Sequence, residues 1–192
     1  MRALFYVSAL LLVACGSNAP KPAGTATAPA EISAATRSSF AAATAAMRAQ
    51  QWREAETQLQ QIARAQPQLS GAHLNLALLY AQTDRNSDAE AEFKQAIAVN
   101  ADNLQARDQY GIWLRTQGRF KDAETIYLQT LQRQSAHADT HLNLGVLYDL
   151  YLGRPAQALE HYQQYLALKG EDEQATRVKS WVADLERRKA GG

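Results

Sequence analysis

The sequence predicts an all-α protein: an α-solenoid of four helical hairpins followed by a C-terminal capping helix. The first reason is a repeated segment, since residues 73–80 (HLNLALLY) return at 141–148 (HLNLGVLY), 68 positions later, or two steps of 34. The intermediate step falls on Arg107, within a segment of similar pattern. A fixed period of this size indicates a repeat array rather than one globular core. The second reason is a chain rich in Ala and Gln and without strand-type alternation, which favours helix.

The first 14 residues have the features of a signal peptide. Arg2 supplies the positive charge, and the apolar stretch that follows, residues 4–13, is too short to span a bilayer, which takes ~20 residues. The stretch ends in Leu-Val-Ala-Cys at residues 12–15, which resembles the cleavage signal of bacterial lipoproteins. That resemblance implies cleavage before Cys15, a diacylglyceryl group and an acyl chain such as palmitate on Cys15, and stable membrane attachment. The alternative is an ordinary secretory signal peptide followed by an incidental cysteine.

Two further observations fit a lipid anchor. Cys15 is the only cysteine and therefore has no partner for an intramolecular disulfide, although the chain is addressed to an oxidising compartment. The next residue is Gly16 rather than Asp, and by resemblance to Gram-negative lipoproteins this implies the outer membrane, on its periplasmic face. Residues 15–35 then form the modified cysteine and a tether of small residues and prolines, for which we expect a flexible span of roughly 25 Å.

The charge of the chain excludes some partners. The formal net charge is +1, and removal of Arg2 with the leader leaves 19 basic and 19 acidic residues. No basic stripe or acidic tail is present, so we expect neither a nucleic-acid partner nor polybasic membrane attachment.

Residues 36–170 resemble the tetratricopeptide repeat (TPR) family, whose units are helix–turn–helix hairpins with small residues at repeat positions 8 and 20. We number each repeat from its first residue, which is Thr36, Ser70, Leu104 or Ala138, and the fourth repeat has one inserted residue before position 20. Small residues allow the two helices of a hairpin to approach closely where they cross, and a bulky residue at position 24 fills the space between successive repeats. Position 8 is Ala43, Ala77, Gly111 and Gly145; position 20 is Ala55, Ala89, Ala123 and Ala158; position 24 is Leu59, Phe93, Tyr127 and Tyr162.

The two ends of the array differ from its middle. In the first repeat Ala42, Ala43 and Ala46 replace the Leu, Gly and Tyr that are usual in the family. At the other end, residues 171–189 predict a capping helix with an apolar stripe, and we expect Trp181 of that stripe to be buried against the fourth repeat. A stripe that docks a partner is the alternative. Its members are Val178, Trp181, Val182 and Leu185.

The sequence predicts a protein that is not an enzyme and holds no metal or cofactor. His137 and His141 are spaced i, i+4, but the metalloprotease pattern requires Glu directly after the first histidine, and Ala138 stands there. We expect His73 and His141, which occupy the same repeat position, to be partly buried and hydrogen-bonded instead. For the carboxylates beside the hairpin turns we expect solvated capping charges. Those carboxylates are Glu54, Glu90, Asp122 and Glu124.

The family resemblance also implies that the first helices of the repeats line a concave groove that binds a segment of another protein. The paired Lys and Arg residues with which some family members clamp a carboxylate are absent. Asn75 and Asn143 match an asparagine that such proteins use to hold a peptide backbone, which suits an amide because it both donates and accepts; the alternative is that both simply follow the repeat consensus. The predicted groove residues are Leu74, Asn75, Leu78, Gln82, Asp108, Gln109, Ile112, Arg115, Leu142, Asn143, Val146 and Asp149.

These observations predict an outer-membrane lipoprotein that faces the periplasm and docks a segment, extended or helical, of another envelope protein. The resemblance implies either a scaffold for envelope complexes or a pilotin-like assembly factor for a type IV pilus secretin. The identity of the partner and the oligomeric state are not encoded in groove residues alone.

Overall fold

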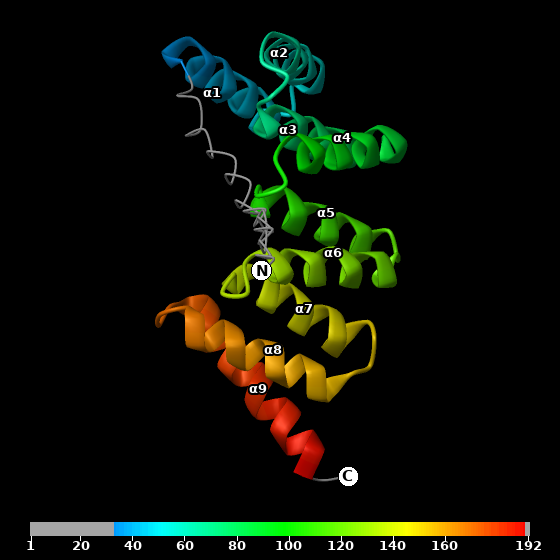
Figure 1. The fold of residues 1–192 in the computed structure, drawn as a ribbon, viewed down its shortest axis with the longest axis vertical. Helices are drawn as coiled ribbons and strands as arrows, with labels where there is room; N and C mark the ends of the chain where they lie inside the picture. The colour runs from blue at the N-terminus through cyan, green and yellow to red at the C-terminus, as the bar shows by residue number, and fades with distance from the viewer. Residues whose placement is uncertain (1–32, 191–192) are drawn as a thin grey trace, which may run out of the picture. The chain divides into compact units, whose positions relative to one another are not determined.

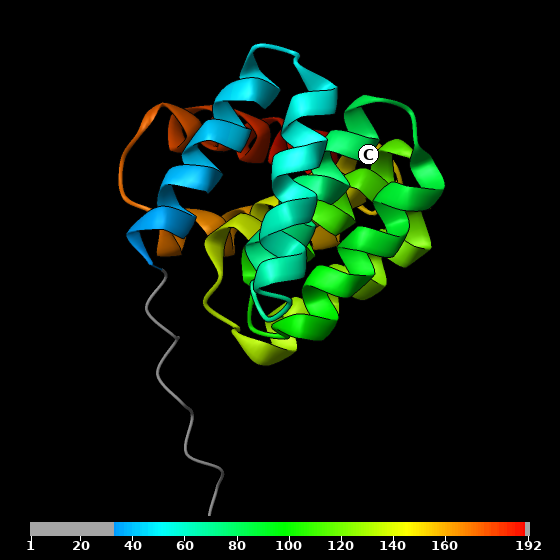
Figure 2. The same ribbon diagram turned by 90° about the horizontal axis from the view of Figure 1, so that it is seen from above.

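The computed structural model describes residues 33–190, and within them every regular element is a helix. The predicted fold class, four helical hairpins with a C-terminal helix, is confirmed (Figure 1). Each hairpin is rotated relative to the one before it, which is visible when the stack is viewed from above (Figure 2). The predicted signal peptide and the lipidated Cys15 lie outside the described residues. The helices are α1 (Ala34–Arg48), α2 (Trp52–Ala65), α3 (Ser70–Gln82), α4 (Asn86–Val99), α5 (Leu104–Thr116), α6 (Phe120–Arg133), α7 (Ala138–Leu150), α8 (Pro155–Leu168) and α9 (Glu173–Ala190).

The turn inside each hairpin uses the same backbone device. One residue at the end of the first helix has a positive φ, between 57° and 73°, and the residue after it donates its N–H to a carbonyl of the last helical turn. Glycine takes this conformation without steric cost, whereas other residues do so at about 1–2 kcal/mol. The residues are Gln50, Asp84, Gly118 and Gly153, so the first two hairpins have a less favourable residue than the last two.

Small and large residues meet inside the hairpins as predicted. The residues at positions 8, 20 and 24 are all buried. A Cβ added at Gly111 would lie 2.6 Å from Cζ of Tyr127, and one added at Gly145 would overlap the ring of Tyr162. The hairpins that carry tyrosine at position 24 therefore require glycine at position 8. The position-24 residue also reaches the next repeat, since Phe93 packs on Tyr110 and Trp113 with ring centroids 5.4 and 5.8 Å apart.

Helix α9 covers the end of the fourth hairpin by packing on α8. Val178 and Leu185 are its buried anchors. Trp181 is half-buried rather than fully buried, and its ring packs on Tyr162 at 5.5 Å. The prediction of Trp181 as a core residue was therefore too strong, because the indole covers the outer edge of Tyr162 and keeps one side in solvent. None of the helices within residues 33–190 is long and apolar enough to cross a membrane.

Candidate functional site

The first helices of the repeats form the inner layer of the array. Neighbouring first helices contact one another, α1 with α3, α3 with α5 and α5 with α7. Within residues 33–190 no comparable contact joins one second helix to another. Helices that approach more closely lie on the inside of the curve, so the groove positions predicted on first helices face the concave side.

The structure distributes the predicted groove residues over three environments. Leu74 and Asp108 are almost fully buried, at 4% and 6% exposure, and offer little surface to a docked segment. Gln82 is exposed at the rim. The half-buried residues that form the groove wall are Asn75, Leu78, Gln109, Ile112, Arg115, Leu142, Asn143, Val146 and Asp149.

An open cleft of about 470 Å³ lies in this wall between α5 and α7. It brings together five of the predicted residues from two repeats and mixes apolar side chains with amides and carboxylates. His137, at the start of α7, was not predicted as a groove residue. The lining consists of Gln105, Asp108, Gln109, Ile112, His137, Asp139, Leu142 and Asn143.

Asp108 is the buried carboxylate at the floor of this cleft. The Thr140 hydroxyl donates to its Oδ1 at 2.6 Å, and His137 Nδ1 lies 3.3 Å from its Oδ2. His137 Nδ1 is also 2.8 Å from the Thr140 hydroxyl oxygen, which accepts from it because the Thr140 proton already points to Asp108. Burial raises the pKa of Asp108, while the Thr140 hydrogen bond, the charge of His137 and the nearby Asn143 amide oppose the rise. The floor of the cleft therefore holds an acidic group tied to the start of α7.

The two predicted backbone-holding asparagines have different surroundings. Asn75 donates its Nδ2 to the Gly71 carbonyl at 2.8 Å, one turn earlier on α3, which leaves its side-chain oxygen as the available group. Asn143 lines the cleft beside Asp108. Their role in holding a peptide stays a prediction.

The histidines of the fourth repeat are engaged in hydrogen bonds. His141 Nε2 donates to the Ser135 carbonyl at 2.9 Å, so its Nδ1 accepts from His161 Nδ1, also at 2.9 Å. His137 points instead to Thr140 and Asp108. Within residues 33–190 no three side chains of the metal-binding types gather around one point.

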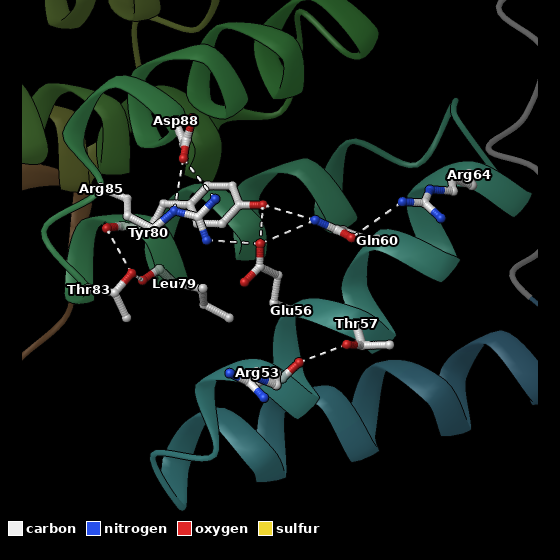
Figure 3. A network of polar contacts seen from close by, with 10 residues as sticks. All are labelled: Arg53, Glu56, Thr57, Gln60, Arg64, Leu79, Tyr80, Thr83, Arg85 and Asp88. Atoms are coloured by element: carbon white, nitrogen blue, oxygen red, sulfur yellow. Dashed lines mark hydrogen bonds and ion pairs between the residues drawn. The ribbon is translucent and has the colours of Figure 1, made fainter.

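A periodic set of ion pairs joins successive repeats, and the sequence analysis missed it. Glu56 of α2 accepts from the Tyr80 hydroxyl at 3.0 Å and from Arg85 at 2.9 Å, both in the next repeat (Figure 3). The same arrangement recurs 34 and 68 residues later with other members. Glu90 accepts from Tyr110 and Arg119, and Glu124 accepts from Tyr148 and Arg154.

These contacts change the expected role of the turn carboxylates. Lys94 and Arg119 lower the pKa of Glu90 to about 2, and burial beside Glu90 raises the pKa of Tyr110 to about 12. Glu90 and Glu124 are therefore not the solvated capping charges that the sequence analysis expected. The sequence contained a signal for these ion pairs, because Glu56, Glu90 and Glu124 are spaced 34 residues apart. Together the ion pairs help to orient each repeat on the one before it.

Hairpins of this geometry, stacked through small residues at positions 8 and 20, define a class of helical repeat proteins that present a concave wall of first helices. Two family models, both described as tetratricopeptide repeat, match residues 40–107 and 104–171, and together they cover most of the chain. The chain therefore belongs to the tetratricopeptide repeat family.

One relative and two solved structures extend this result. The type IV pilus assembly protein PilF of Pseudomonas aeruginosa is 27% identical over 117 residues, which are 60% of this chain and 46% of PilF, so the chain spans about half the length of that relative. The solved structure of Pseudomonas aeruginosa PilF is similar with a TM-score of 0.70 at 23% identity, over 82% of this chain and 70% of that one. YrrB, described as a TPR protein with an unusual peptide-binding site, has a TM-score of 0.59 at 20% identity, over 76% of this chain and 75% of that one. These structural likenesses show the fold.

Proposed function

We propose that this protein is a protein–protein interaction scaffold anchored in the outer membrane and facing the periplasm, and that it docks a segment of another envelope protein in its concave groove. The observation that carries the proposal is the cleft between α5 and α7, where apolar side chains lie beside amides and a buried carboxylate. Such a wall can bury apolar surface of a docked segment and offer hydrogen bonds to its main chain.

A second candidate is a pilotin-like assembly factor for a type IV pilus secretin. The observation in its favour is the likeness to PilF, whose printed name assigns it to type IV pilus assembly. Loss of piliation after deletion of the gene supports this role, whereas unchanged piliation with altered assembly of other envelope complexes supports the general scaffold.

The groove is tested by a photo-cross-linking residue at Gln109 in the full chain, expressed in its own host. We expect the double change Asn75→Ala with Asn143→Ala to lower the cross-linked product about thirtyfold or more, because the docked backbone would lose two hydrogen bonds at ~1 kcal/mol or more each. Helical content should stay unchanged by circular dichroism.

The matched control removes two amides from the convex side, Gln132→Ala with Gln164→Ala, both exposed. Glu92 and Lys94 are also exposed or half-buried on an outer helix, but they are unsuitable as a control because Glu92 binds His73 and Lys94 binds Glu90. Cross-linking that survives the groove change and fails after the convex change would move the site to the outer helices.

The anchor is tested separately. Cys15→Ser should release the protein from the outer-membrane fraction into the soluble periplasmic fraction, because the acyl chains supply the attachment. Equal recovery of Cys15→Ser and the unchanged protein with outer membranes would refute the lipid anchor without touching the groove.

A further inference from the structure

Within the described part of the chain, residues 33–190, the first hairpin leaves uncovered a face that every later hairpin buries. Positions 3 and 7 of α3, α5 and α7 pack against the second helix of the preceding repeat and are at most 4% exposed. In α1 the equivalent residues are Ser38 and Ala42, and both are exposed. The uncovered residues are small and uncharged, whereas the outer side of α9 at the other end of the array is charged. The buried equivalents are Ala72, Leu76, Ala106, Tyr110, Thr140 and Leu144.

A cleft of about 450 Å³ opens beside this face, between α1 and α2. In the second and fourth hairpins the same place is filled by a bonded pair from positions 4 and 23: His73 with Glu92 at 2.7 Å, and His141 with His161 at 2.9 Å. In the first hairpin these positions hold Ser39 and Gln58, which do not meet.

Gln58 lacks one of its partners as a result. Its Nε2 donates to Glu54 at 3.1 Å, but its Oε1 is buried and has no hydrogen-bond partner. Ser39 is occupied with the Ala35 carbonyl of its own helix. Compared with the second and fourth hairpins, this cleft therefore lacks one bulky side chain and one hydrogen-bond donor for Gln58 Oε1.

The first hairpin is basic, and Arg37 and Arg48 flank this face on α1. The hairpin carries four exposed arginines, and none has an ion-pair partner within residues 33–190. Of its two acidic residues, Glu56 is held by Arg85 and Glu54 by Gln58. The turn arginines of later repeats, Arg85, Arg119 and Arg154, are paired, and Gln51 stands at their position in the first repeat. The four are Arg37 and Arg48 on α1 and Arg53 and Arg64 on α2, each pair eleven residues apart and so on one side of its helix.

We propose that this N-terminal face docks an acidic amphipathic helix of another protein, which places a large side chain with an N–H or O–H donor in the cleft between α1 and α2. The occupant is a helix because a second helix covers the equivalent face of α3, α5 and α7. It is acidic because one of its flanks would meet Arg37 and Arg48 of α1, which have no ion-pair partner within residues 33–190.

Two other occupants fit the charges poorly. A second copy would bring the same arginines against themselves across a two-fold interface. The segment of this chain before Ser33 contains one acidic residue, Glu31, and its stretch 16–32 has a single large apolar residue, Ile32. The surface is separate from the concave groove of α3, α5 and α7.

The test places a photo-cross-linking residue at Ala42 in the full chain in its own host and sequences the captured peptide. We expect a segment with net negative charge and apolar residues at helical spacing. Arg37→Glu with Arg48→Glu should lower the yield about tenfold or more, and Arg37→Lys with Arg48→Lys should keep it. The proposal is overturned if the cross-link goes to another copy, to residues 16–32 or to a basic or extended segment, or if no cross-link forms. It is also overturned if Arg37→Glu with Arg48→Glu leaves the cross-linking yield unchanged.

A filling variant supplies the second arm. Ser39→Trp should place an indole in the cleft with its N–H toward Gln58, raise the melting temperature, and abolish capture at Ala42. Capture at Gln109 in the groove should persist, which separates failure here from failure of the proposed function. Full capture at Ala42 by a folded, more stable Ser39→Trp protein would show that the cleft takes no part.

Discussion

The first and fourth hairpins share one backbone plan and differ in almost every residue that fills it. At positions 8 and 24 the fourth hairpin has Gly145 with Tyr162, where the first has Ala43 with Leu59. The fourth is covered by α9, and the first is open. The comparison shows that the 34-residue period specifies where the helices lie. The packing between them depends on pairs of residues, such as those at positions 8 and 24, and both members of a pair differ between the two hairpins.

The hairpins also differ in how well their small polar pairs are satisfied. His141 and His161 bond to each other in the fourth, but Ser39 and Gln58 stay apart in the first. The first hairpin also turns through Gln50 with a positive φ, where the fourth uses Gly153. Packing, turn chemistry and polar satisfaction all make the first hairpin the weaker end of the array, and we expect it to open locally before the rest.

The largest effect that tests this comparison is expected at Gly145. Gly145→Ala should destabilise the protein by about 2 kcal/mol, because overpacking a close contact costs ~1–3 kcal/mol and the new Cβ would overlap the Tyr162 ring. Urea unfolding of the purified protein measures the change. Alanine has a higher helix propensity than glycine, and this gain partly offsets the cost of overpacking. The expected loss of about 2 kcal/mol already includes that offset.

A double-mutant cycle shows whether positions 8 and 24 act as a pair. Gly145→Ala with Tyr162→Leu recreates the pair found in the first hairpin and should cost less than the sum of the two single changes by about 1 kcal/mol. Strictly additive costs would mean that the two positions are independent and that the contrast between the hairpins is incidental.

Trp181 at the covered end should give a somewhat smaller loss. A fully buried tryptophan changed to alanine costs ~3–5 kcal/mol, and since this side chain is half-buried we expect about 1–2 kcal/mol for Trp181→Ala. Trp52, half-buried in the open first hairpin, is the matched position for comparison. A melting temperature that is unchanged by Trp181→Ala would mean that α9 is not a cap.

The sequence predicts most of the fold and less of the site, for a physical reason. The period gives each residue its place on a helix, so the buried small and bulky positions follow from it. The period does not give the curvature of the inner layer. That curvature determines which predicted groove residues are buried, such as Leu74 and Asp108, and which stay half-exposed, such as Ile112 and Leu142. The His141–His161 contact depends on the side chain across the hairpin and was not foreseen either.

The turns should show a smaller contrast between the two hairpins. Gln50→Gly should stabilise the first hairpin by about 1 kcal/mol, since glycine adopts the positive φ without strain. Gly153→Ala should destabilise the fourth by a similar amount, and a Cβ there meets nothing within 4 Å, so the cost is conformational rather than steric. Opposite signs in thermal unfolding are the expected result, and equal signs would contradict the turn assignment.

The smallest expected effect is a pH response that the fourth hairpin has at positions 4 and 23 and the first hairpin, with Ser39 and Gln58 there, lacks. Burial, with the neighbouring His141, lowers the pKa of His161, while Glu160 opposes the shift. The unfolded chain takes up a proton near the ordinary histidine pKa of about 6.5, and the folded chain resists it to lower pH. The contribution of His161 is therefore present above about pH 6.5 and is lost as the pH falls below that value, through the lowered pKa of the folded state. His161→Gln keeps a donor for His141 but does not titrate, so its stability should fall less than that of the unchanged protein between pH 7.5 and 5.5. Parallel losses in the two proteins, measured by urea unfolding at both pH values, would place the acid sensitivity elsewhere.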